Sequence, residues 1–145
     1  MIQVRTHVFE TNSSMTHTIV MCKDEEYKKF INGEYYFNEY LKPQFLPKDE
    51  ALKYNAKKLR EILEDVNKDD SEYENETIEA LTEENIKLYE EGKFNIEDFY
   101  LDNYEISDVM YFDYEYFLST TCEYYEQFSA SFNGVTAFGY YGHEY

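Results

Sequence analysis

Near its C-terminal end the chain carries an Asn-Gly pair between two strand-like runs, a pattern with few structural solutions. The runs are residues 128–132 and 135–140, and Asn133-Gly134 lies between them. Both turn residues accept positive φ, which the type I′ turn of a two-residue β-hairpin requires. We therefore expect an antiparallel hairpin over these residues.

A second hairpin is expected at the N-terminal end. Residues 2–9 alternate in character and are rich in β-branched side chains, which is typical of a strand. The cluster Thr11-Asn12-Ser13-Ser14 favours a turn, because these side chains bond to nearby backbone groups. Residues 16–22 then predict the returning strand.

The middle of the chain predicts helices. The strongest pattern covers residues 49–66, where apolar side chains form one stripe and Lys and Arg lie opposite. Shorter helices are expected over residues 24–31, from Thr77 or Thr82 to Glu91, and over residues 95–101, where Asn95 and Asp98 resemble a capping pair. Residues 34–46 are rich in aromatic side chains and leave their conformation open.

From Val109 the pattern changes to a period of two, and we expect a strand over residues 109–118. The expected fold class is therefore α+β, with antiparallel strands at both ends of the chain and two to three helices in the middle. At 145 residues the chain fits one domain, 1–145. Residues 1–93 would form its hairpin and helical part, and residues 94–145 an acidic, aromatic β part.

The charge of the chain is concentrated in its second part. The net charge is −18 overall, and residues 61–145 hold 23 acidic against three basic residues. Residues 94–145 contain ten acids and no Lys or Arg, with Tyr and Phe between the acids. Such a field repels DNA, RNA and anionic membranes and attracts basic clefts. We expect neither direct nucleic-acid binding nor membrane binding.

Few residues suit a metal, a cofactor or a disulfide. Cys22 and Cys122 are far apart in the sequence, which fits a reducing compartment. The sequence has no apolar run suited to a signal peptide or a membrane span, so we expect a cytoplasmic protein without cofactor or metal. Residues 65–76 resemble a calcium loop, but Asp70 stands where its sharp turn favours Gly.

The loop Thr11–His17 allows two interpretations. It is a capped turn, or a small site in which His17 activates Ser13 or Ser14, near His7. The run Phe9-Glu10-Thr11-Asn12-Ser13-Ser14-Met15-Thr16-His17 resembles the opening of small uncharacterised proteins of phages and mobile elements. This resemblance implies such an origin and no activity.

The acids of residues 94–145 suggest a partner-binding surface. Alternate strand residues and i, i+4 helix neighbours are spaced about as closely as successive nucleic-acid phosphates. The expected binding residues are Glu97, Asp98, Asp102, Glu105, Asp108, Tyr111, Asp113 and Glu115. The run Tyr111-Phe112-Asp113-Tyr114-Glu115-Tyr116 also resembles acidic aromatic segments of ArdA-type antirestriction proteins.

These patterns favour a stoichiometric inhibitor rather than an enzyme. We expect a phage-encoded acidic nucleic-acid mimic that occupies the basic DNA- or RNA-binding cleft of a host defence protein, of anti-CRISPR or antirestriction type. Its aromatic surplus is compatible with a homodimer. The alternatives are a small ligand-binding protein or hydrolase centred on the Thr11–His17 loop, and a virion structural or assembly protein.

Overall fold

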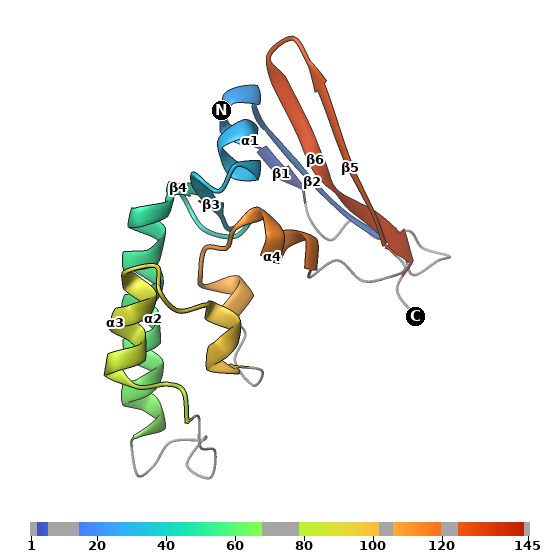
Figure 1. Ribbon diagram of the computed structural model, residues 1–145. Helices are drawn as coiled ribbons and strands as arrows, with labels where there is room; N and C mark the ends of the chain where they lie inside the picture. Colours follow the sequence, from blue (N-terminus) through green and yellow to red (C-terminus); the bar gives the residue numbers. More distant parts are fainter. Residues whose placement is uncertain (1–2, 6–14, 68–78, 102–105, 120–124, 144–145) are drawn as a thin grey trace.

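The two ends of the chain meet in one four-stranded antiparallel sheet (Figure 1). The computed structural model describes residues 3–5, 15–67, 79–101, 106–119 and 125–143. The strand order is β1-β2-β6-β5, with the bounds Gln3–Arg5 for β1, Met15–Lys23 for β2, Tyr125–Phe132 for β5 and Val135–His143 for β6. Both predicted hairpins are confirmed as antiparallel pairs, and the β2–β6 pair joins them.

The C-terminal hairpin turns at Asn133-Gly134, as predicted. Their φ angles are +53° and +80°, the positive values that a type I′ turn requires. The Gly134 carbonyl accepts a hydrogen bond of 3.0 Å from the backbone N–H of Asp24, the first residue of a helix. The turn is thereby tied to an element more than a hundred residues earlier in the chain.

Helices and a small second sheet fill the middle of the chain, which confirms the α+β class. The helices are α1 (Asp24–Ile31), α2 (Lys48–Val66), α3 (Glu83–Glu90) and α4 (Tyr114–Ser119), with 3-10 turns η1 (Ile96–Phe99) and η2 (Ile106–Asp108). Residues 34–46, for which the sequence predicted no particular conformation, form most of a two-stranded sheet of β3 (Tyr35–Phe37) and β4 (Phe45–Pro47). The predicted helix over residues 95–101 is only η1, and the Asn95 side chain makes no capping hydrogen bond.

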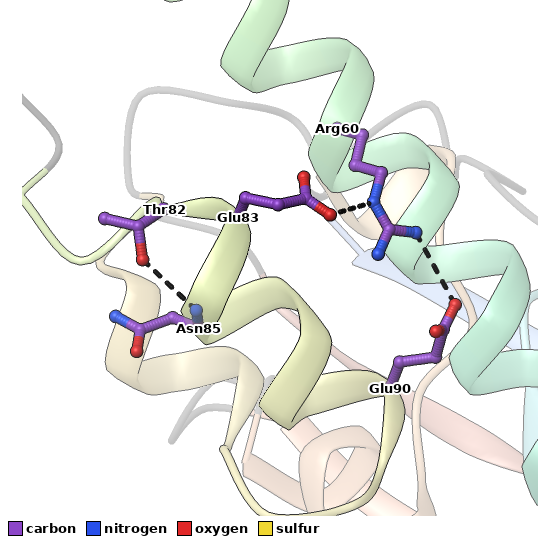
Figure 2. A network of polar contacts seen from close by, with 5 residues as sticks. All are labelled: Arg60, Thr82, Glu83, Asn85 and Glu90. Atoms are coloured by element: carbon purple, nitrogen blue, oxygen red, sulfur yellow. Dashed lines mark hydrogen bonds and ion pairs between the residues drawn. The ribbon is translucent and has the colours of Figure 1, made fainter.

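Helices α2 and α3 lie side by side and are joined by a network of polar contacts (Figure 2). Arg60 on α2 donates from Nε to Glu83 at 2.8 Å and pairs through Nη1 with Glu90 at 3.5 Å. The Thr82 hydroxyl accepts from the backbone N–H of Asn85 and caps α3. Of the two predicted starts of this helix, Thr82 is therefore the observed one.

The predicted strand over residues 109–118 is wrong. Phe112 alone makes a bridge, with Phe37 of β3, and the chain then turns into α4. Asp113 causes the change, because its carboxylate accepts the backbone N–H of Tyr116 at 2.9 Å and so caps the first turn of α4. Two aromatic side chains spaced for a helix, Tyr114 and Phe117, then pack against the sheet.

Two hydrophobic clusters hold the fold together, and both draw on distant parts of the chain. One lies between α2, α3 and the segment that follows them, and consists of Leu52, Ala56, Leu59, Leu81, Ile86, Tyr89, Phe99, Leu101, Met110 and Phe112. The other lies under the large sheet, and consists of Val20, Cys22, Phe30, Phe37, Phe45 and Phe138. The acidic part 94–145 therefore contributes to both clusters and packs on the helices as well as on the N-terminal strands.

Candidate acidic binding site

The segment Val109–Phe112 is the base on which the acidic residues are placed. Two buried asparagines hold it. The Asn55 side chain bonds to both backbone polar groups of Tyr111, and the Asn38 amide donates to the carbonyls of Ser107 and Met110. Since the whole run is anchored by hydrogen bonds from both sides, side chains that flank it have defined positions.

Phe112 and Tyr116 form the wall between two cavities. Their rings stack with centroids 3.8 Å apart and planes 12° from parallel. Both residues line a cavity on each side, and each cavity has a volume of about 290 Å³. The stack therefore separates two acidic environments that the sequence places in one run.

The first cavity, called the acidic cavity below, gathers four of the expected binding residues, Tyr111 and three acids. Glu97 comes from η1, Asp113 caps α4 and Glu115 lies in the first turn of α4. These three acids line the cavity together with the single basic residue Lys48 and four tyrosines, Tyr36, Tyr89, Tyr111 and Tyr116. Three acids and four tyrosines thus line one cavity, a combination that suits a cation.

The tyrosines of the acidic cavity are held neutral. Burial, and second to it the Asp113 carboxylate, raises the pKa of Tyr36 to about 12. Burial also raises the pKa of Tyr116, with the negative charge of Glu97 as a further cause. For both groups the physical cause is the same, because ionisation would place a negative phenolate in a poorly hydrated position and next to a carboxylate. The phenols therefore stay protonated, and able to donate hydrogen bonds, to a higher pH than an ordinary tyrosine.

The second cavity lies on the other side of the Phe112–Tyr116 stack. It is lined by Asp108 and Glu39, with Tyr40 and Tyr140 among its other residues. Burial raises the pKa of Tyr40, and the nearby Glu39 and Asp108 carboxylates add to the effect. Asp108 is therefore separated from Glu97, Asp113 and Glu115, and the acids do not form one straight row.

The other expected binding residues differ in where the structure places them and in how exposed they are. Asp98 is exposed on η1 and lines neither cavity. Tyr111 lines the acidic cavity, but it is only 2% exposed and its hydroxyl donates to the Pro43 carbonyl at 2.6 Å. Asp102 and Glu105 lie outside the described residues. The prediction missed Tyr36, Tyr89 and Glu39, because no sequence pattern connects them with residues 94–145.

The acids of this region form no ion pair with a Lys or Arg in the described part of the chain. Ion pairs there join Lys58, Arg60 and Lys93 to acids of α2, α3 and the turn after α3. None of these pairs includes the five described acids of the expected set, Glu97, Asp98, Asp108, Asp113 and Glu115. No described Lys or Arg therefore neutralises them in a direct ion pair, and Lys48 is the one basic residue that lines the acidic cavity.

The remaining sequence motifs fall largely outside the described residues. Most of the Thr11–His17 loop and of the calcium-like loop is not described, so neither hypothesis is tested. Over the described ranges, no group of three or more His, Cys, Asp or Glu residues could hold a metal ion. Among the same residues, no helix has the length and apolar character to cross a membrane.

Comparison with known proteins adds no relative. None of the protein-family models, curated proteins or solved structures compared with the chain matches it.

Proposed function

We propose that this protein is a phage-encoded acidic nucleic-acid mimic that inhibits a host defence nuclease, of anti-CRISPR or antirestriction type. The observation that carries the proposal is the gathering of Glu97, Asp113 and Glu115, without a described ion-pair partner, around one aromatic cavity. Such a surface attracts the Lys and Arg side chains that a nuclease uses to hold phosphates.

Arginine is the side chain that best fits the acidic cavity. Its guanidinium donates in a planar fork to carboxylates and stacks on aromatic rings. The cavity offers both kinds of contact, from Glu97 and Glu115 and from the rings of Tyr36 and Tyr116. An arginine bound there is no longer available to nucleic acid, so inhibition would be stoichiometric and would need no catalytic group.

The rigidity of the acidic cavity supports binding. Asp113 is fixed by its capping bond to α4, and Tyr116 by its stack on Phe112. Acids that are already in place lose little conformational freedom when a partner binds. An acidic disordered tail of equal charge would have to be ordered first.

The experiment is capture of basic proteins from a bacterial lysate on the immobilised full chain, followed by a salt gradient. We expect a nucleic-acid-binding protein that elutes steeply with salt and is displaced by DNA or RNA. When the captured protein is purified, its nuclease activity should be lost once the acidic chain is added at a stoichiometric ratio.

A charge-matched pair of variants makes the test specific. Glu97→Gln with Glu115→Gln removes two charges from the acidic cavity, whereas Glu64→Gln with Glu84→Gln removes two exposed charges from α2 and α3. Only the first pair should lower the eluting salt concentration. If both pairs act equally, or if nothing basic is retained at low salt, the acids serve solubility and the proposal fails.

The two alternative functions give different results in the same experiment. A ligand-binding protein or hydrolase centred on the Thr11–His17 loop would be insensitive to both charge pairs and sensitive to Ser13→Ala with His17→Ala. A virion assembly protein would form large oligomers instead of a defined complex with a nuclease.

A further inference from the structure

The second cavity, on the far side of the Phe112–Tyr116 stack, has its own aromatic lining and its own acids. Residues of β3, η2, α4 and β6 all line it. Its volume of about 290 Å³ lies at the lower end of the range of ligand pockets, so a group the size of one side chain fits it better than a larger ligand. Six aromatic residues belong to its lining, namely Phe37, Tyr40, Phe112, Tyr116, Phe117 and Tyr140.

One buried side chain positions the two segments that carry the acids of the second cavity. Asn38 is 2% exposed, and its amide donates to the Ser107 carbonyl at 2.9 Å, one residue before Asp108. Its Oδ1 accepts the backbone N–H of Tyr40 at 2.7 Å, one residue after Glu39. Asn38 thereby joins segments that lie 69 residues apart in the sequence. The backbone that carries both acids is therefore already ordered when a ligand arrives, which lowers the cost of binding.

The lining of the second cavity favours an organic cation. Glu39 and Asp108 supply negative charge, the aromatic rings supply cation–π contacts, and no described Lys or Arg lines the cavity. An apolar group would cover both carboxylates and supply no counter-charge, which is costly. A metal ion is not favoured either, because no group of three or more His, Cys, Asp or Glu among the described residues could hold one.

The position of the second cavity relates it to the acidic cavity. Both cavities are lined by Phe112 and Tyr116, whose ring centroids are 3.8 Å apart. Ligand groups in the two cavities would therefore lie against the same pair of rings and would be close neighbours on the partner. Basic side chains of a phosphate-binding cleft meet this requirement, because successive phosphates lie close together along a nucleic-acid strand.

We propose that the second cavity takes a second basic side chain of the same partner, so that this protein recognises two neighbouring basic residues instead of one. The inference rests on the proposed function, which places an arginine in the acidic cavity. Once the first basic side chain is bound, the second enters its cavity at high effective concentration, which strengthens binding. Selectivity follows as well, because a protein whose basic residues are far apart can fill only one cavity.

Fluorescence anisotropy of labelled peptides titrated with the full chain tests the proposal. One set of peptides carries two arginines, adjacent or separated by up to three residues, and a first reference has one of the arginines replaced by Gln. A second reference keeps both arginines but separates them with an extended run of prolines, so that its charge is equal and its reach is wrong. We expect at least one closely spaced peptide to bind at least about tenfold more tightly than both references.

Two charge-matched pairs of substitutions locate the second basic side chain. Glu39→Gln with Asp108→Asn removes the charges of the second cavity and should abolish most of the advantage of the closely spaced peptide. Glu64→Gln with Glu84→Gln removes two exposed charges from α2 and α3 and should preserve that advantage. Circular dichroism checks that each variant is folded, and the comparison of peptides on the wild type does not depend on any variant.

Two results would overturn the role of the second cavity. They are equal binding of the closely spaced and the proline-separated peptides, and an advantage that survives Glu39→Gln with Asp108→Asn. In either case, weaker binding of the one-arginine peptide to Glu97→Gln with Glu115→Gln would leave the proposed function standing. If that last pair changes the binding of no peptide, the acidic cavity holds no arginine and both proposals fail.

Discussion

The side-chain amide of Asn55 bonds to both backbone polar groups of Tyr111. Its Oδ1 accepts the Tyr111 N–H at 2.9 Å, and its Nδ2 donates to the Tyr111 carbonyl at 2.7 Å and to the Tyr89 hydroxyl at 2.8 Å. Asn55 thus acts on Tyr111 as a neighbouring strand would, from the middle of helix α2. Since Asn55 is fully buried, water cannot replace these bonds.

Replacing Asn55 should therefore be among the most destabilising single changes in the chain. Asn55→Ala leaves the N–H and the carbonyl of Tyr111 buried without a partner, and we expect a loss of about 3 kcal/mol in the free energy of unfolding. Tyr89→Phe removes only the hydroxyl that accepts from Asn55 and should cost about 1 kcal/mol. Urea unfolding followed by circular dichroism measures both.

A double-mutant cycle makes the Asn55 prediction stricter. The Asn55–Tyr89 bond is absent from both single variants, so their costs should not add in the double variant. Strict additivity would contradict a direct contact between the two side chains. A small cost for Asn55→Ala alone would mean that the Tyr111 backbone finds other partners.

The regular elements of this fold could be predicted because their patterns are local. Asn133-Gly134 specifies its own turn, and the apolar stripe of α2 follows from helical spacing alone. The segment around Tyr111 could not be predicted in this way. Its alternation suggests a strand, but its bonding partners are Asn55 and Phe37, which lie 56 and 75 residues away in sequence.

The candidate site shows the same limit. The acids of residues 94–145 are visible in the sequence, but their grouping depends on Asp113, which was expected inside a strand and instead begins a helix. A capping residue is recognised only when the helix after it is recognised. The tyrosines that complete the acidic cavity come from β3 and α3, so only the fold connects them with Glu97 and Glu115.

Asp113 has a structural role and, in our proposal, a binding role, and two substitutions separate them. Asn accepts a backbone N–H at a helix start about as well as Asp, whereas Ala does not. We expect Asp113→Ala to lower the free energy of unfolding by about 1 kcal/mol, and Asp113→Asn to lower it by only a few tenths of a kcal/mol. Both variants should weaken capture of a basic protein by similar amounts, because both remove the charge.

The comparison of Asp113→Asn with Asp113→Ala uses two readouts, urea unfolding and the eluting salt concentration. If Asp113→Asn is as unstable as Asp113→Ala, the carboxylate charge matters more to α4 than its capping bond. If Asp113→Asn captures a basic protein as strongly as the wild type, Asp113 does not contact that protein.

Lys48 is expected to weaken binding of a basic partner. It lines the acidic cavity with Glu97, Asp113 and Glu115, and partly offsets their field. Lys48→Gln should move elution of a captured basic protein to higher salt, whereas Lys53→Gln, an exposed position of α2 that does not line this cavity, should have a smaller effect. Equal shifts for the two variants would indicate that net charge alone determines binding, without a role for the cavity.

Tyr36 should make the protein sensitive to alkaline pH. Its pKa rises from an ordinary value of 10.0 to about 12 in the folded protein, first through burial and then through Asp113. A group with a raised pKa stabilises the fold below its unfolded pKa, and this contribution is lost as the pH rises toward the folded pKa. We therefore expect the free energy of unfolding to fall between pH 10 and about 12, and less steeply in Tyr36→Phe. Urea unfolding at a series of pH values gives both slopes, and the absorbance of tyrosinate gives the titration itself.

In Asp113→Asn the Tyr36 phenol should titrate at lower pH than in the wild type, because the second cause of the shift is removed while burial remains. Equal slopes for the wild type and Tyr36→Phe would show that this phenol is not held neutral inside the acidic cavity.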